Sequence, residues 1–281
     1  MGSGAANASY RGRIAPSPTG LLHLGHARTF WIAYSRACEA GGVLVFRNED
    51  LDGDRVRPEF VEAQLHDLRW FGIEWQEGPD VGGPHSPYSQ SGRLPLYRDV
   101  FERLRRVGMV YPCRCSRKDI ALAVSAPHAA DDEPVYPGTC RGPTDWAASS
   151  GRPVAWRFRV PDGEVIEFED RVLGPQRFVA GRDFGDFVVV RQDGLPSYQL
   201  ACTVDDHLMG ITEVVRGADL LVSTARQILL YRALGWAVPG FFHCPLVTDE
   251  NGVRLAKRHA ALALATLREQ GRSPESLRAS G

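Results

Sequence analysis

The stretch Arg11-Gly-Arg-Ile-Ala-Pro-Ser-Pro-Thr-Gly-Leu-Leu-His-Leu-Gly-His26 decides the fold class. Residues 11–15 predict a short strand, and the two prolines and the glycine after it predict a loop. Apolar residues then recur at helical spacing as far as Cys38, and Gly41-Gly42 ends that helix. The continuous apolar run 43–46 predicts a strand buried on both faces of a parallel sheet. Strand, loop, helix and strand form a right-handed crossover unit, which indicates an α/β fold.

The rest of the chain predicts two α/β halves around an insertion. Alternating apolar residues in 154–160 and 166–168, separated by Pro161-Asp-Gly163, predict a hairpin within the insertion. Further helices and strands are predicted at 58–68, 97–107, 187–190, 197–208, 211–215, 220–234 and 241–247. We therefore expect a Rossmann-like, doubly wound parallel sheet with an inserted α+β subdomain. The predicted units are 10–110, 111–185 (the insertion), 186–264 and a short C-terminal tail, 265–281.

Composition narrows the function classes. The 281 residues carry a net charge of -1, which excludes binding of nucleic acid through bulk charge. RNA contact would need a local patch, and the basic residues between Arg103 and Lys118 form a candidate, although a solvated helix face explains them equally well. The chain has no apolar stretch near the roughly 20 residues that span a bilayer, and its start does not resemble a signal peptide. A cytoplasmic protein is expected.

The motif His23-Leu-Gly-His26 opens the first predicted helix. A helix that follows the first strand of a parallel sheet offers free N–H groups and the positive end of its dipole to a phosphate. Gly25 lacks a side chain, so a flat ring such as adenine can lie against the backbone. The pattern predicts a phosphate-binding site, whereas two exposed helix histidines are the ordinary alternative.

Charged residues gather where predicted strands end. Arg13 ends the first strand, Glu49 follows the second, and Arg216 ends the strand 213–216. Ligands of open α/β sheets bind at the carboxyl ends of the strands, so these side chains face one crevice. Each of them has a plain structural alternative, such as a surface ion pair.

Three of the six cysteines are close enough in sequence to suggest a metal site. Cys113-Arg-Cys115 is followed by Cys140, and three thiolates are three quarters of a tetrahedral zinc site. From the residues alone, His128 is the natural fourth ligand, and free cysteines without metal are the alternative.

The string from Arg13 to Gly20, together with the histidine–glycine motif, resembles the signature of the glutamyl-tRNA synthetase family, a class I aminoacyl-tRNA synthetase family. The resemblance covers roughly residues 10 to 260. It implies a ligase that forms an acyl-adenylate from ATP with Mg²⁺ on the phosphates. The family's second signature corresponds to Arg254-Leu-Ala-Lys-Arg258, with Ala256 in the place of the usual serine. Lys257 is one of only two lysines among 33 basic residues, in agreement with that motif.

The resemblance also assigns roles to individual residues. It implies ATP binding by His23, Gly25, His26 and Lys257, with both histidines and Lys257 catalytic. It implies that L-glutamate is bound by Arg13, Ala15, Ser17, Glu49, Tyr198 and Arg216. In the short glutamyl-queuosine branch of the family, the insertion can hold zinc on three cysteines and a tyrosine. This favours Cys113, Cys115, Tyr136 and Cys140 over a set that contains His128.

The acceptor is predicted from the same branch. The chain ends 24 residues after Lys257, whereas full glutamyl-tRNA synthetases continue with a helical domain that reads the anticodon. This favours a monomeric enzyme that activates glutamate without tRNA and transfers it to queuosine in the anticodon loop of tRNA(Asp). Two alternatives stay open. One is a truncated glutamyl-tRNA synthetase that charges a tRNA 3′ end, and the other is a catalytically silent paralogue that binds ATP or RNA.

Overall fold

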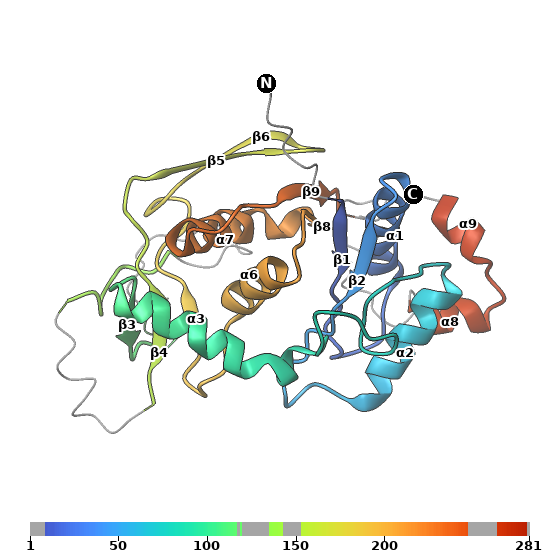
Figure 1. The fold of residues 1–281 in the computed structure, drawn as a ribbon, viewed down its shortest axis with the longest axis horizontal. Coiled ribbons are helices and arrows are strands. Elements are labelled where there is room, and N and C mark those ends of the chain that lie inside the picture. Colours follow the sequence, from blue (N-terminus) through green and yellow to red (C-terminus); the bar gives the residue numbers. More distant parts are fainter. Residues whose placement is uncertain (1–8, 117–118, 120–134, 143–152, 247–262, 280–281) are drawn as a thin grey trace.

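The structure is a computed structural model that describes residues 9–116, 119, 135–142, 153–246 and 263–279 (Figure 1). The second-signature loop with Lys257, as well as His128 and Lys118, lies outside these residues. Within the described part of the chain, the helices are all too short or too polar to cross a membrane.

The first crossover unit forms as predicted. Strand β1 (Arg11–Ile14) leads through a loop into helix α1 (Leu24–Glu39), which returns to strand β2 (Val43–Phe46). The two strands pair in parallel, from Arg11 opposite Val43 to Ile14 opposite Phe46. Gly42 is required at the turn into β2, because a Cβ atom there would lie 2.3 Å from the carbonyl oxygen of Tyr10. The unit places the start of α1 and the end of β2 at the same edge of the sheet.

The remaining elements follow in chain order. Up to the end of the predicted insertion they are α2 (Pro58–Trp70), the 3₁₀ turn η1 (Gln90–Arg93), α3 (Leu94–Arg106), β3 (Val110–Cys113), β4 (Ala155–Phe158), β5 (Val165–Asp170) and β6 (Gly174–Val179). After it come β7 (Val188–Val190), α6 (Tyr198–Leu208), β8 (Glu213–Gly217), the 3₁₀ turn η2 (Ala218–Leu220), α7 (Leu221–Leu234), β9 (Gly240–Cys244), α8 (Leu264–Glu269) and α9 (Pro274–Ala279).

The strands form three hydrogen-bonded sheets, in the orders β1-β2, β3-β4-β7 and β6-β5-β9-β8. Strands β1 and β8 are also adjacent, since the N–H of Thr212 donates to the carbonyl of Arg11 at 2.9 Å. Further along both strands, the side chain of Arg13 donates to the carbonyl of Val215 at 2.9 Å, so β1 and β8 run in the same direction. The α/β fold is confirmed, but the sheets are mixed, because β3, β4, β6 and β7 pair antiparallel.

The prediction of a hairpin between residues 154–160 and 166–168 is wrong. Strand β4 pairs with β3 and β7, and β5 pairs with β6. The turn at Pro161-Asp-Gly163 exists, with Gly163 at a φ of +81°, but it carries the chain from one sheet to another. The hairpin lies at the next turn, where the Asp170 carboxylate accepts the N–H groups of Val172 and Leu173 at 3.0 and 2.9 Å.

Two hydrophobic cores lie on opposite faces of the β1, β2 and β8 layer, because successive strand residues point to opposite sides. Val45 and Val214 pack into the core beneath α6 and α7. Their neighbours Leu44, Phe46 and Val215 pack into the core beneath α1. Figure 1 shows α6 and α7 on one side of β1 and β2, with α1 on the other.

The segment predicted as a C-terminal tail contributes to the second core. Leu264 and Leu267 of α8 and Leu277 of α9 are buried there. Arg268 of α8 also forms an ion pair with Asp67 of α2. These two short helices therefore stabilise the first half of the fold.

Candidate active site

The residues predicted to bind glutamate lie at one edge of the central strands. Arg13 is in β1 and Arg216 in β8, Glu49 follows β2, and Tyr198 is the first residue of α6. Ala15 is half-buried and Ser17 is exposed in the loop after β1. The carboxyl ends of adjacent strands thus bring together side chains that are far apart in the sequence.

The loop 15–20 is held from two directions. The N–H of Glu49 donates to the carbonyl of Pro16 at 3.0 Å. The amide of Gln64, buried on α2, donates to the carbonyls of Ser17 and Gly20 at 3.0 and 3.3 Å. Sequence reasoning missed Gln64, whose polar side chain in the middle of an apolar helix face was the available signal.

Arg47 links the acidic residues of the crevice, and sequence reasoning did not single it out. Its fully buried guanidinium donates to Glu49 at 3.0 Å and to Asp206 at 2.7 Å. Asp206 is also 3.4 Å from Nε of Arg13. Burial raises the pKa of Glu49, and the nearby charges of Arg47 and Arg13 partly oppose that rise. The bond from Arg47 therefore fixes the position of the Glu49 carboxyl group.

Arg216 carries a second cation to the crevice. Its guanidinium donates to the hydroxyl of Tyr198 at 3.1 Å, to the hydroxyl of Thr224 at 2.6 Å and to Nε2 of His243 at 3.3 Å. Arg216 is 4% exposed, whereas Tyr198 is 38% exposed. Ser197 caps α6 by accepting the N–H of Leu200 at 3.4 Å, which fixes the start of the helix that carries Tyr198. A carboxylate that entered beside Tyr198 would meet a cation already oriented by the protein.

His23 and His26 lie at the start of α1, as the predicted phosphate site requires. His23 is the N-cap residue, and its ring stacks on that of His26 with 3.7 Å between the centroids. A Cβ atom at Gly25 would lie 3.2 Å from the His23 ring, so a larger residue there would press on it. The positive end of the α1 dipole adds to the attraction for an anion.

The predicted second signature, with Lys257, lies outside the described residues. The chain is described again from Ala263, which bridges to His23, and the N–H of Leu264 donates to the carbonyl of Leu22 at 2.8 Å. The segment from Ala263 is therefore fixed beside His23, in the predicted phosphate site.

The three predicted cysteine ligands gather with Tyr136 in the insertion. The sulfur atoms of Cys113, Cys115 and Cys140 lie within 4.8 Å of one another, and those of Cys115 and Cys140 are 3.6 Å apart. The Tyr136 hydroxyl is 3.4 and 3.6 Å from Cys113 and Cys115. Tetrahedral zinc with bonds of about 2.3 Å to sulfur and 2.0 Å to oxygen would separate sulfur pairs by about 3.8 Å and oxygen–sulfur pairs by about 3.5 Å. These separations fit a four-coordinate metal.

Arg157 of β4 lies against this cluster and was not predicted. Its Nε donates to the sulfur of Cys113 at 3.3 Å, and its guanidinium lies 4.0 Å from the centroid of the Tyr136 ring. Three thiolates and a phenolate exceed the charge of a divalent ion by two, so a buried arginine offsets part of the surplus. Gly185 allows the backbone around Tyr136 to lie close to it, since a Cβ atom at residue 185 would be 2.9 Å from the backbone nitrogen of Tyr136.

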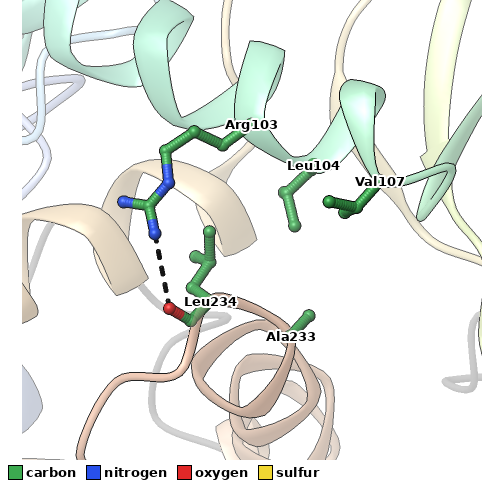
Figure 2. Close-up of a pocket in the computed structure, with 5 residues that line it drawn as sticks. All are labelled: Arg103, Leu104, Val107, Ala233 and Leu234. Carbon is green, nitrogen blue, oxygen red and sulfur yellow. Dashed lines mark hydrogen bonds between the residues drawn. The ribbon is translucent and has the colours of Figure 1, made fainter.

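A hollow of about 80 Å³ between α3 and α7 contains none of the predicted site residues. Figure 2 shows Arg103, Leu104, Val107, Ala233 and Leu234 around it, with Arg103 donating to the carbonyl of Leu234 at 3.4 Å. Small-molecule sites measure roughly 300–1,000 Å³, so this hollow is too small for an amino acid with ATP. Of the basic patch, Arg103 also lies over Trp236, and Arg105 pairs with Glu102. These contacts neither require nor exclude an RNA partner.

Comparison with known proteins places this geometry in a family. Residues 9–280 match the model of the class I tRNA synthetase (E and Q) catalytic domain. The glutamyl-Q tRNA(Asp) synthetase of Symbiobacterium thermophilum is 54% identical over 95% of this chain and 83% of its own, and that of Nitratidesulfovibrio vulgaris is 49% identical over 93% and 82%.

A solved structure is also similar. It is a glutamate tRNA ligase from Elizabethkingia meningosepticum in complex with its amino acid, with a TM-score of 0.79 and 32% identity over 89% of this chain. This chain spans about half of that ligase, 52% of its length. The prediction of an enzyme of the synthetase type is confirmed by these matches. By its sequence and its fold, the chain belongs to the class I tRNA synthetases (E and Q) and carries their catalytic domain.

Proposed function

We propose that this protein activates L-glutamate with ATP, without the help of tRNA, and transfers it to queuosine in the anticodon of tRNA(Asp). The observation that carries the first step is the pair of buried cations, Arg13 and Arg216, at one sheet edge with the acceptor Glu49. Two carboxylates and one ammonium group of glutamate match two arginines and one carboxylate. A neutral glutamine side chain would leave one arginine without its anion.

Activation needs alignment and charge stabilisation more than acid–base chemistry. A carboxylate oxygen of glutamate attacks the α-phosphorus of ATP, the bond to the bridging oxygen breaks, and pyrophosphate leaves with that electron pair. His23 and His26, at the positive end of α1, are the proposed donors to the phosphates. Lys257 and the backbone of Gly25 complete the proposed ATP site, with Mg²⁺ on the phosphates as they bind. A protein nucleophile is not required.

The acceptor is proposed from the relatives. Two relatives carry the name glutamyl-Q tRNA(Asp) synthetase, and this chain covers 83% and 82% of their lengths. In the transfer, a hydroxyl of the queuosine diol attacks the adenylate carbonyl and AMP leaves. An anticodon loop suits such a crevice because its unpaired bases can be splayed out and held by stacking. We propose that the protein acts as a monomer in the cytoplasm, where it would meet its tRNA.

Zinc is the metal that we propose for the insertion. Cys113, Cys115, Tyr136 and Cys140 would hold it, and three thiolates favour zinc over harder ions such as Mg²⁺. His128 was the alternative fourth ligand from the residues alone. The separations between Tyr136 and the cysteines support the tyrosine. With four protein ligands the metal would cross-link β3 to the segment around Cys140 and take no part in the chemistry.

The test has two stages. Glutamate-dependent exchange of pyrophosphate into ATP is measured without tRNA, with glutamine and aspartate as controls and Lys257→Ala as a variant expected to lose about 10² in rate. Labelled glutamate and ATP are then offered with two samples of tRNA(Asp), one containing queuosine and one with guanosine. We expect exchange with glutamate alone and labelling of the queuosine sample alone. Exchange that requires tRNA, or preferential labelling of tRNA(Glu), would instead support charging of a tRNA 3′ end.

A further inference from the structure

His243 joins the predicted insertion to the glutamate crevice. It lies in β9, its side chain is fully buried, and its Nδ1 is 2.6 Å from the carboxylate of Asp170 at the end of β5. Its Nε2 faces the other way, 3.3 Å from Nε of Arg216 and 2.9 Å from the hydroxyl of Thr224. The ring therefore bridges an acidic residue of one segment and the substrate-facing arginine of another.

The contacts of Asp170 define the state of the ring. Its carboxylate also accepts backbone N–H groups from Val172, Leu173 and His243 itself. Burial opposes ionisation, but the N–H of Leu173 and the His243 ring together hold the pKa of Asp170 below its ordinary value. An ionised carboxylate can only accept, so Nδ1 of His243 carries the proton that it donates to Asp170.

The opposite nitrogen must then be an acceptor. Arg216 has only donors, so its Nε–H can bond to Nε2 of His243 only if that nitrogen is unprotonated. Burial, with the nearby charge of Arg216, lowers the pKa of His243 to about 4, so the ring is neutral near pH 7. With the proton on Nδ1, that nitrogen donates to Asp170 and Nε2 accepts from Arg216, whereas the other tautomer would place the lone pair of Nδ1 against the Asp170 carboxylate.

This arrangement fixes the orientation of the guanidinium. Its Nε is held by His243 and one terminal nitrogen by Thr224, so the other terminal nitrogen is directed to Tyr198 at the exposed side of the crevice. Three directed contacts remove the rotational freedom of a long side chain before the substrate arrives. Such preorganisation reduces the cost of binding a carboxylate.

We propose that Asp170 and His243 are positioning residues that orient Arg216 for the glutamate carboxylate, with Asp170 selecting the histidine tautomer. The inference rests on the proposed function for its substrate. It gives the β5–β6 hairpin a role in the amino-acid site, because the turn that Asp170 closes also supplies the carboxylate behind His243.

Nuclear magnetic resonance of the ¹⁵N-labelled wild-type protein reads the tautomer directly. We expect one buried, neutral ring with its proton on Nδ1, assigned by its loss in His243→Gln. Asp170→Asn should change that ring, because the neutral amide can donate to Nδ1 and leave the proton on Nε2. A wild-type ring protonated on Nε2, or charged at pH 7, would overturn the proposal.

Exchange kinetics provide the second readout. His243→Leu removes the acceptor and should raise the KM for glutamate about tenfold or more, with the KM for ATP unchanged. His243→Gln offers an amide that can donate to Asp170 and accept from Arg216, so it should recover most of that loss. The matched control is His207→Leu. His207 is also a histidine in a stacked contact, with its ring centroid 3.9 Å from that of Trp236, but it does not contact Arg216 or Asp170 in the contacts described. Its glutamate KM should equal that of the wild type.

Other outcomes separate the two proposals. If both His243 variants lower the melting temperature but leave the KM for glutamate at the wild-type value, the pair is structural and the inference is wrong. If the wild-type protein does not activate glutamate, the proposed function fails. The resonance experiment alone then decides whether His243 presents an acceptor to Arg216.

Discussion

The proposed glutamate crevice, around Arg13, Glu49 and Arg216, and the cysteine cluster both bury polar side chains, but they balance charge by different means. In the crevice, Arg47 meets Glu49 and Asp206 through ion pairs of 3.0 and 2.7 Å. Asp205 is bound in turn by Arg93 at 2.6 Å and by the hydroxyl of Tyr97 at 2.9 Å. Positive and negative side chains of the protein itself therefore compensate one another.

In the part of the chain that the structure describes, the cysteine cluster is in contact with fewer cations than the network of Arg47. Among the residues that the structure describes, Arg157 is the cation whose contacts with Cys113 and Tyr136 are seen. Buried thiolates without enough positive charge are costly, and a divalent metal supplies that charge. The proposed glutamate site therefore balances its charges with its own side chains, whereas the proposed zinc would supply positive charge to the cluster.

The largest effect is expected when the balance within the crevice is broken. Arg47→Met removes a fully buried cation and leaves Glu49 and Asp206 without their closest partner. Breaking a buried pair from one side costs about 3–5 kcal/mol, so the free energy of unfolding measured in urea should fall by that amount.

The matched control for Arg47→Met is Arg55→Met. Arg55 pairs with Asp52 at the surface, where its side chain is 70% exposed, so its loss should cost less than about 1 kcal/mol. Equal losses in the two variants would show that the network does not balance the crevice. The bound metal should be the same in both variants if the two clusters are independent.

Local sequence signals predicted the elements that lie next to one another in the chain. The strand–loop–helix–strand unit follows from short patterns, and so do the positions of Arg13 and Arg216 in strands and of Glu49 after a strand. The wrong hairpin had an equally good local pattern. Its strands were separated because β4 finds partners in β3 and β7, and such long-range pairing is not encoded in the turn.

The residues near the site that the sequence did not predict were missed for the same reason, because their partners are far away in the chain. His243 and Asp170 are 73 positions apart; His243 is a polar residue in an otherwise largely apolar strand, and Asp170 is one of three acidic residues in β5. Arg47 stands beside Glu49 in the sequence, but its partner Asp206 is 159 positions away. A sequence shows such a residue as an oddity, whereas its role appears only when the fold supplies the partner. The clustering of Cys113, Cys115 and Cys140 was predicted because cysteines are rare enough to be noticed without a fold.

The second prediction concerns the metal. Zinc at about 100 times its dissociation constant should stabilise the wild-type protein by about 2.7 kcal/mol over the chelator-treated protein, as thermal or urea unfolding measures. Cys140→Ser should lose the bound zinc, by elemental analysis, and with it this stabilisation. Cys38→Ser is the control, because Cys38 is exposed in α1 and should keep one zinc.

A wild-type stability that does not respond to zinc would mean that the cluster is held by its own packing. The comparison is sharpened by measuring glutamate binding in the same samples. Because the crevice balances its own charges, the KM for glutamate in the exchange assay should not change when the metal is removed.

The smallest effect is a pH dependence that belongs to the crevice alone. The folded protein holds His243 neutral with a pKa of about 4, mainly by burial, whereas the unfolded chain has the ordinary value of 6.5. Below pH 6.5 the unfolded state takes up a proton that the folded state does not, so the stability falls as the pH falls. The slope is steepest midway between pH 6.5 and 4, at about 1.2 kcal/mol per pH unit, and the contribution is complete above that window. Glu49, whose pKa is raised, changes the stability in the opposite sense near the lower end of the window, so the wild type alone would show a mixed slope.

The experiment therefore compares the stability of the wild type with that of His243→Gln at each pH. Subtracting the two free energies of unfolding removes the contribution of Glu49, which both proteins share. That difference should shrink by about 1 kcal/mol between pH 6.5 and 5.5 in urea unfolding. A difference that is constant with pH would mean that His243 takes up its proton at the same pH in the folded and unfolded states, and the neutral acceptor behind Arg216 would then be lost below pH 6.5.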